Sequence, residues 1–258
     1  MDIQQLKPSK ILLLGELCVD TYLFGHVDRI SPEAPVPVLN RSRETSLEGM
    51  GGNVRNNLES LGNTVHFITN NETIEKIRVV DEKHNHQLLR MDKEHPLQPY
   101  DFELLPDVKD YDGLVISDYD KGFLPYPIIY AIVQEANLNA IPVFLDTKKT
   151  YLSGITKCFL KLNADEYAAL SGYPHGNHTI VTHGSEGAMY DGITYPAGEV
   201  HLADPTGAGD TFLAAFVSAY LSCNDVPESI EFANLCASIS VTKLGCHAVT
   251  KEEIHERS

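Results

Sequence analysis

Short runs of apolar residues recur along the chain, and most are continuous rather than alternating with polar residues. Continuous runs of this length are typical of parallel strands, which are buried on both faces. The strand-like runs are ILLL (11–14), VHFI (65–68), LVIS (114–117), VFL (143–145), CFLKL (158–162) and TIVT (179–182). Helix-like patterns span residues 53–61, 125–137, 164–170, 210–221 and 227–244. Strands and helices in alternation predict an α/β fold with helices on both faces of a mostly parallel sheet.

Two segments depart from this pattern. Residues 22–45 hold several prolines in a partly alternating stretch, and residues 76–92 resemble two strands joined by the polar turn DEKHNH. Proline is confined largely to edge strands because it cannot donate a ladder hydrogen bond. We therefore predict a small β-layer, with strands drawn from about 22–45 and 76–92, that projects from the body of a single domain spanning residues 1–258.

Composition narrows the class of ligand. The 258 residues are 43% hydrophobic, which suffices for one sizeable core, and the formal net charge of −16 argues against a nucleic-acid-binding face. No apolar run reaches the roughly 18 residues of a membrane span, and the N-terminus lacks a signal-peptide pattern. Five cysteines without a C-x-x-C pair fit buried thiols in a reducing cytoplasm.

Polar motifs, three of them with a glycine, follow several of the predicted strands. They are GELCVD (15–20), SDYDKG (117–122), NADE (163–166) and THGSEG (182–187). In an open parallel sheet, ligands bind beyond the carboxyl ends of the strands. We therefore expect a binding site along that edge.

The stretch DPTGAGDTF (204–212) precedes an apolar helix-like pattern. If a helix begins here, the N–H groups of Gly207, Ala208 and Gly209 converge on one point, where the helix dipole attracts an anion. Asp210 is then either a capping acid or a base that takes a proton from an attacking hydroxyl while the amides hold a phosphoryl group. The motif lacks the G-K-[ST] of a Walker loop, and its spacing alone leaves both interpretations open.

DPTGAGDTF resembles the C-terminal signature of the ribokinase-like, PfkB family of carbohydrate kinases. Within that family, RISPEAPVPV (29–38) resembles the bacterial D-glycero-β-D-manno-heptose 7-phosphate kinases, as do IRVVDEKHNHQLLRMDKE (77–94), SDYDKGFL (117–124) and TKLGCHAVT (242–250). The resemblance implies a ribokinase-like fold with a small β-sheet lid. It also implies ATP-dependent phosphorylation of a sugar phosphate, D-glycero-D-manno-heptose 7-phosphate to the 1,7-bisphosphate.

The resemblance also implies roles for individual residues. Asp210 matches the catalytic base, residues 207–209 match the anion hole, and Asp20 matches an acid that binds sugar hydroxyls. Asn163 and Glu166 match an N-x-x-E motif that organises Mg²⁺ and the ATP phosphates, with Glu166 acting through water. The other implied substrate-binding residues are Gly51, Gly52, Asn53, Arg78, Arg90, Asp118 and Lys121. The other implied ATP-binding residues are Thr182, His183, Gly184, Gly187 and Asn234.

Plainer interpretations stand beside these roles. Asn163 and Glu166 would also suit an ordinary helix start, Arg78 and Arg90 would suit solvated strand charges, and Asn234 would suit a surface amide. Besides ATP and Mg²⁺, the resemblance allows for a monovalent cation near residues 204 and 206, and for a homodimer formed through the lid.

Two departures from the family pattern keep rival functions open. GMGGNVRNNL (49–58) stands where the family has G-G-A-A-N-V-A-x-N-L, with Met50 in place of the second glycine. A further helix and strand, which the family has between residues 71 and 75, are missing. We also expect a kinase alone, since no H-x-G-H nucleotidyltransferase motif is present. The alternatives are a PfkB-type kinase for another sugar, or a non-catalytic sugar or nucleotide binder.

Overall fold

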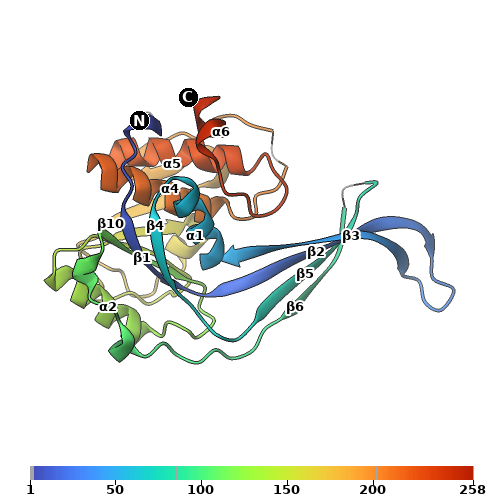
Figure 1. Ribbon diagram of the computed structural model, residues 1–258, viewed down its shortest axis with the longest axis horizontal. Helices are drawn as coiled ribbons and strands as arrows, with labels where there is room; N and C mark the ends of the chain where they lie inside the picture. Colours follow the sequence, from blue (N-terminus) through green and yellow to red (C-terminus); the bar gives the residue numbers. More distant parts are fainter. Residues whose placement is uncertain (1–2, 85, 202, 258) are drawn as a thin grey trace.

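An eight-stranded sheet organises the body of the protein (Figure 1), in a computed structural model that describes residues 3–84, 86–201 and 203–257. Its strands are β1 (Lys10–Gly15), β4 (Thr64–Ile68), β7 (Gly113–Asp118), β8 (Val143–Thr147), β9 (Phe159–Asn163), β10 (His178–Thr182), β11 (Ala188–Tyr190) and β12 (Ile193–Tyr195). They lie in the order β12-β11-β10-β9-β8-β7-β1-β4, and only β11 and β12 run antiparallel to a neighbour that precedes them. The prediction of an α/β fold with a mostly parallel sheet is confirmed.

Helices cover both faces of this sheet. They are α1 (Gly51–Ser60), α2 (Tyr126–Leu138), α3 (Ala164–Ala168), α4 (Ala208–Cys223), α5 (Val226–Ser240) and α6 (Lys251–His255). Ile11 and Leu13 of β1 pack in one core cluster with residues of α1, α4, α5 and α6, whereas Leu12 and Leu14 pack in a second cluster with α2. Successive side chains of a strand point to opposite faces, so a continuous apolar run suits a strand between two helical layers.

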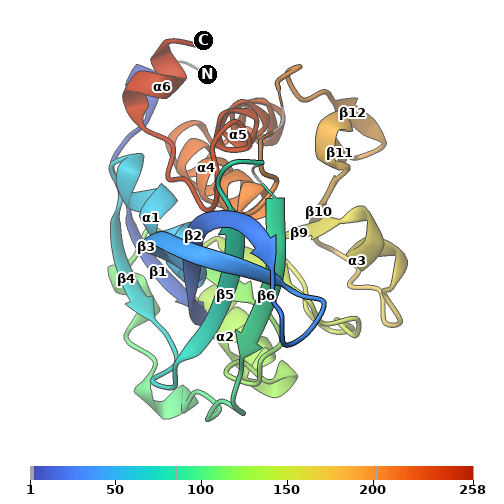
Figure 2. The same ribbon diagram turned by 90° about the vertical axis from the view of Figure 1, so that its right-hand side faces the viewer.

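A smaller sheet projects to one side of the body in Figure 1. Its strands are β2 (Leu17–Ile30), β3 (Pro37–Met50), β5 (Ile74–Asp81) and β6 (His86–Lys93), in the order β3-β2-β5-β6. This is the small β-layer that the fold class included, and we call it the lid. Figure 2 shows the lid in front of the sheet and helices of the body.

The lid strands start closer to the main sheet than the sequence indicated. β2 begins at Leu17, two residues after β1 ends, so GELCVD runs into a strand instead of forming a loop. β3 runs to Met50 and α1 begins at the next residue, so the strand passes directly into the helix at Met50, which adopts a left-handed φ of 57°. Polar residues on the buried face of β2, among them Asp20, obscured its alternation.

Three further findings concern the remaining helices and strands. Helix α5 ends at Ser240, four residues before the predicted end, and the carbonyl of Val241 instead accepts the N–H groups of Ala203 and Asp204. Strands β11 and β12 and helix α6 are three to five residues long and gave no clear periodic signal. β4 forms the edge of the main sheet, and residues 69–73 lead straight into the lid.

The remaining composition-based expectations concern cysteines and membranes. All five cysteines are unpaired in the structure. Within the described ranges, the helices are too short or too polar to cross a membrane.

The core predicts a large effect for one aromatic side chain. Phe144 is fully buried, stacks on Phe159 at a centroid distance of 5.1 Å and meets Phe216 edge-on at 6.0 Å. We predict that Phe144→Ala lowers the free energy of unfolding by about 3–5 kcal/mol, because the missing ring leaves a cavity. The control Leu138→Ala, at a position 81% exposed, should change it by less than about 0.5 kcal/mol. Urea unfolding measures both, and similar losses would contradict the prediction.

Candidate active site

A cleft of about 990 Å³ lies along the carboxyl edge of the main sheet, beside the N-terminus of α4. It is lined by residues at the carboxyl ends of β7, β8, β9 and β10, and by residues of α4 and α5. Nine of the predicted site residues line it: Asn163, Thr182, Gly184, Gly187, Gly207, Ala208, Gly209, Asp210 and Asn234. The topology of the parallel sheet brings these distant segments together, because its strands all end at the same edge.

Asp210 is buried in the first turn of α4 and is hydrogen-bonded through both carboxylate oxygens. The hydroxyl of Tyr119 donates to Oδ1 at 2.5 Å, and the side-chain amide of Asn53 donates to Oδ2 at 3.0 Å. Burial raises the pKa of the Asp210 carboxyl, the two hydrogen bonds lower it, and the net shift is upward. The site therefore holds a carboxylate with increased proton affinity, as a general base requires.

The turn before α4 has free amide groups. Gly207 is the N-cap of α4 with a φ of 79°, and a Cβ there would lie 2.5 Å from Nδ2 of Asn53, so only glycine fits. The N–H of Ala208 donates to the carbonyl of Pro205 at 3.2 Å, whereas the N–H groups of Gly207 and Gly209 have no acceptor within the described ranges. Two of the three amides predicted to hold an anion are thus available to one.

A buried ion pair lies beside this turn. Nζ of Lys161 donates to Oδ2 of Asp146 at 2.6 Å, and both residues line the cleft. Oδ1 of Asp146 is buried without a hydrogen-bond partner. A carboxylate oxygen of this kind suits a hard divalent cation such as Mg²⁺. The described residues contain no cluster of three or more metal-ligating side chains, so most ligands of such an ion would be water and phosphate.

Asn163 and Glu166 form a capping box at the start of α3. The side chain of Asn163 accepts the Glu166 N–H at 2.8 Å, and the Glu166 carboxylate accepts the Asn163 N–H at 2.7 Å. Glu166 also forms an ion pair with Lys148, which lines the cleft. These two residues therefore form the helix start that the plainer interpretation expected. Lys148 and Asn163 also line the cleft.

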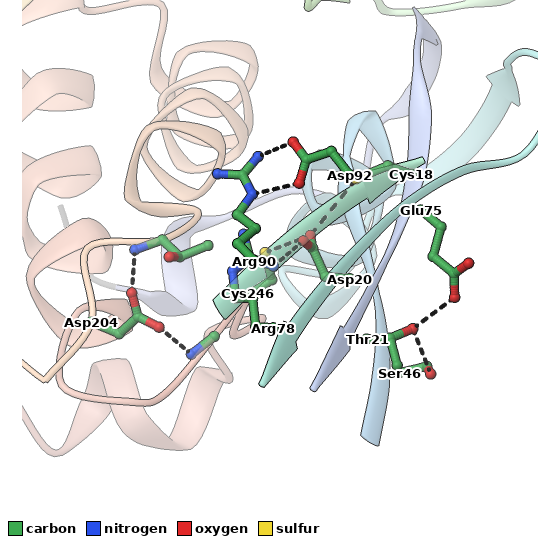
Figure 3. A network of polar contacts seen from close by, with 12 residues as sticks. Cys18, Asp20, Thr21, Ser46, Glu75, Arg78, Arg90, Asp92, Asp204 and Cys246 are labelled. Atoms are coloured by element: carbon green, nitrogen blue, oxygen red, sulfur yellow. Dashed lines mark hydrogen bonds and ion pairs between the residues drawn. The ribbon is translucent and has the colours of Figure 1, made fainter. Parts of the chain in front are cut away.

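The predicted sugar-binding residues lie where the lid meets the body. Figure 3 shows Asp20 of β2 between Arg78 and two thiols: Arg78 forms an ion pair with Oδ1, and Sγ of Cys18 and Cys246 lie 3.7 and 4.0 Å from Oδ2. Arg78 is paired in register with Arg90 on the neighbouring strand. The lid thus carries two adjacent guanidinium groups next to the predicted hydroxyl-binding acid.

Several predicted residues lie outside the cleft. The buried carboxylate of Asp118 accepts from Thr147 and Lys149, and Nζ of Lys121 donates to Glu94 at 2.8 Å. Gly51 and Gly52 are buried at the start of α1, His183 is not among the cleft-lining residues, and the Arg90 side chain forms two hydrogen bonds of 2.7 Å with Asp92.

Sequence reasoning missed several residues of the cleft, among them Tyr119, Asp146, Lys148 and Lys161. The strand-end rule, applied to VFL (143–145), points to Asp146 and Lys148 in the following DTKK. Lys161 interrupts the apolar run CFLKL, and a lysine in a fully buried strand signals a charged partner or a ligand. No sequence signal distinguished Tyr119 from its polar neighbours in SDYDKG.

Comparisons with known proteins agree with this architecture. The model of the pfkB family carbohydrate kinases matches residues 128–253. The chain is 31% identical over 309 residues to bifunctional protein HldE of a Nitratiruptor species, and 30% identical over 313 residues to that of Sulfurimonas denitrificans. These alignments cover 97% and 96% of this chain but only 65% and 64% of those proteins, so the chain spans about two thirds of their length.

Solved structures share the fold at low sequence identity. A ribokinase from Thermotoga maritima has a TM-score of 0.71 at 18% identity, with 96% of this chain and 98% of that chain covered. Phosphofructokinase-2 from Escherichia coli in complex with potassium has a TM-score of 0.73 at 16% identity, with 96% and 97% covered. The ribokinase-like fold expected from the sequence is confirmed.

The raised pKa of Asp210 predicts an effect on stability. A carboxyl whose folded-state pKa exceeds its unfolded value destabilises the folded protein increasingly as pH rises from the unfolded toward the folded pKa. We predict that Asp210→Asn raises the midpoint of urea unfolding at pH 8, and that the difference from the unsubstituted protein shrinks on acidification. A difference that stays constant from pH 8 to pH 4 would show that ionisation of Asp210 is not its cause.

Proposed function

Because this chain belongs to the PfkB family of carbohydrate kinases, we propose that it transfers the γ-phosphoryl group of ATP to a hydroxyl of a sugar phosphate. The substrate proposed is D-glycero-D-manno-heptose 7-phosphate and the product is the 1,7-bisphosphate. One observation carries the proposal: the buried carboxylate of Asp210 stands beside the free amides of Gly207 and Gly209 at a helix N-terminus, in a cleft of about 990 Å³. A base next to an anion-binding turn is the arrangement that phosphoryl transfer to a hydroxyl requires.

Each group has a separate task in this reaction. The acceptor hydroxyl gives its proton to the Asp210 carboxylate while its oxygen bonds to the γ-phosphorus, and the bond from that phosphorus to the β–γ bridging oxygen breaks to release ADP. The amides of Gly207 and Gly209, with the positive end of α4, stabilise the negative charge on the transferring group. Positioning and electrostatics supply most of the rate, since the protein forms no covalent bond to the phosphoryl group.

Asp146, Lys148 and Lys161 suit the phosphate end of ATP. The unpartnered Oδ1 of Asp146 and, through water, Glu166 are the residues that would hold Mg²⁺. When bound, the ion neutralises charge on the ATP phosphates. Thr182, Gly184, Gly187 and Asn234 line the same cleft and complete the proposed nucleotide site.

Three basic residues of the lid, Lys76, Arg78 and Arg90, support a phosphorylated sugar as the acceptor. Arg78 and Arg90 are cross-strand neighbours, an arrangement that is unfavourable for like charges unless anions lie nearby. Asp20 and Asp92 pair with them. Lys76, two residues before Arg78, lies 5.9 Å over the ring of Tyr119 and has no hydrogen-bond or ion-pair partner in the part of the chain that the structure describes. In a protein of net charge −16, this local cluster favours an anionic substrate group.

Four further expectations belong to the proposal: a homodimer, a monovalent-cation site, a single domain and a cytoplasmic location. The side chains of Leu89 and Met91 on β6 are 53% and 43% exposed, which favours a homodimer that covers the lid. Asp204 accepts the N–H groups of Thr206 and Gly245, each at 2.9 Å, so a monovalent cation would bind beside a carboxylate that already joins two turns. Residues 1–258 are proposed to form one kinase domain. The use of ATP as its proposed co-substrate supports a cytoplasmic location.

The proposal is tested by ADP release in a coupled assay across sugars and sugar phosphates. We predict turnover with the heptose 7-phosphate, and a KM for that substrate about tenfold or more higher in Lys76→Met, because the variant cannot form the charge-assisted hydrogen bond proposed between Nζ of Lys76 and the phosphate of the substrate. The KM for ATP should not change. Turnover of fructose or ribose species without heptose 7-phosphate would identify a kinase for another sugar, and ligand binding without ADP release from any sugar would identify a binder.

Removal of the base should stop the reaction without emptying the nucleotide site. We predict that Asp210→Asn lowers kcat by about 10²- to 10⁴-fold, the contribution of a positioned general base, while ATP still binds. The matched control is Asp191→Asn in the exposed turn between β11 and β12, which should retain activity. Full activity of Asp210→Asn in the ADP-release assay would overturn the assignment of the base.

A further inference from the structure

We propose that Tyr119 is a positioning residue that keeps the carboxylate of Asp210 ionised and oriented toward the acceptor hydroxyl. The inference rests on the proposed function, since it concerns the base of that reaction. Its geometric basis is the hydrogen bond of 2.5 Å from the Tyr119 hydroxyl to Oδ1 of Asp210, inside the cleft that both residues line.

Hydrogen bonds to Glu16 anchor the loop that carries Tyr119. The N–H groups of Tyr119 and Lys121 donate to the two carboxylate oxygens of Glu16, at 2.8 and 3.2 Å, and Glu16 is fully buried. Asp118 accepts the N–H of Asp120 at 3.1 Å. Asp118 and Lys121, two of the predicted residues that lie outside the cleft, therefore belong to the loop that places the tyrosine.

The ring of Tyr119 is also fixed from both sides of the site. Nζ of Lys76, from the lid, lies 5.9 Å from the ring centroid, and Nζ of Lys148, from the end of β8, lies 5.3 Å from it. Both distances fall within the range of cation–π contacts. The aromatic ring thus lies between the proposed sugar side and the proposed ATP side, with its hydroxyl on the base.

The charges around Asp210 explain why a donor is needed. Asp146 at the end of β8 raises its pKa, and Lys161 of β9 lowers it, although Lys161 is already paired with Asp146. Cys246, Cys18 and Lys148 also interact with it electrostatically, from the segment after α5, from β2 and from the end of β8. Asn53 of α1 gives the only other hydrogen bond to its carboxylate in the described ranges.

Tyr119 is suited to donate at every physiological pH. Burial, and after it the charge of Asp210, raise the pKa of the Tyr119 phenol well above its usual value, so the hydroxyl keeps its proton. In the reaction, the proton of the acceptor hydroxyl moves to the Asp210 carboxylate and Tyr119 retains its own. A hydrogen bond to Oδ1 favours the ionised base, and Oδ2, which accepts from Asn53, has a second lone pair that can take the proton.

The test is Tyr119→Phe, which removes the hydroxyl but keeps the ring between the two lysines. We expect kcat/KM on the acid side of the pH profile to fall about 10- to 100-fold, the contribution of a hydrogen bond to a charged group, and to recover as the pH rises. The KM for ATP should not change. The matched control is Tyr126→Phe, outside the cleft, whose hydroxyl donates to the carbonyl of Ser153; it should leave the profile in place.

An active Tyr119→Phe enzyme with an unshifted acid limb would overturn this inference while leaving the kinase intact. Absence of ADP release from the unsubstituted protein would instead overturn the proposed function. A measurement independent of turnover covers that case: urea unfolding of Tyr119→Phe, Asp210→Asn and the double variant. Coupling between the two substitutions at pH 8 that disappears on acidification supports the inference, and additive effects at pH 8 exclude it.

Discussion

The site depends on the two hydrogen bonds that hold the buried carboxylate of Asp210. Its donors come from Asn53 at the start of α1 and Tyr119 after β7, 157 and 91 residues away in the chain. A buried carboxylate without donors would take up a proton and lose its use as a base. The main sheet, α1 and α4 must therefore all be in place before the residue has its proposed chemistry.

The proposed substrates are anions, and the protein proposed to bind them is itself acidic. Its net charge of −16 repels phosphate esters at long range, so attraction must come from local groups. On the body, these are the free amides of Gly207 and Gly209 and the dipole of α4. On the lid, they are Lys76 and the cross-strand pair of Arg78 and Arg90. The proposed transfer takes place between these two sets of groups, next to the base.

The lid and the body are joined by short connections that place these groups. Glu16 alone separates β1 from β2, and β3 passes into α1 through the left-handed Met50 without a loop. Asn70, between β4 and β5, accepts the N–H of Leu17 at 2.7 Å and so ties the start of β2 to the edge of the sheet. Such links leave little freedom in how the lid meets the cleft.

The order of strands and helices, and the position of the glycine turn at the start of α4, could be predicted from the sequence, because apolar periodicity and the DPTGAGD motif are local properties. The strand-end rule pointed to Asn163 and Thr182, whereas Asn234 came only from the family resemblance. Tertiary packing decided the rest: the hydrogen-bond partners of Asp210, the pairing of Lys161 with Asp146, and the position of Asp118 outside the cleft. Hydrogen bonds between residues far apart in the chain leave no periodic trace, because they depend on which elements the fold brings into contact.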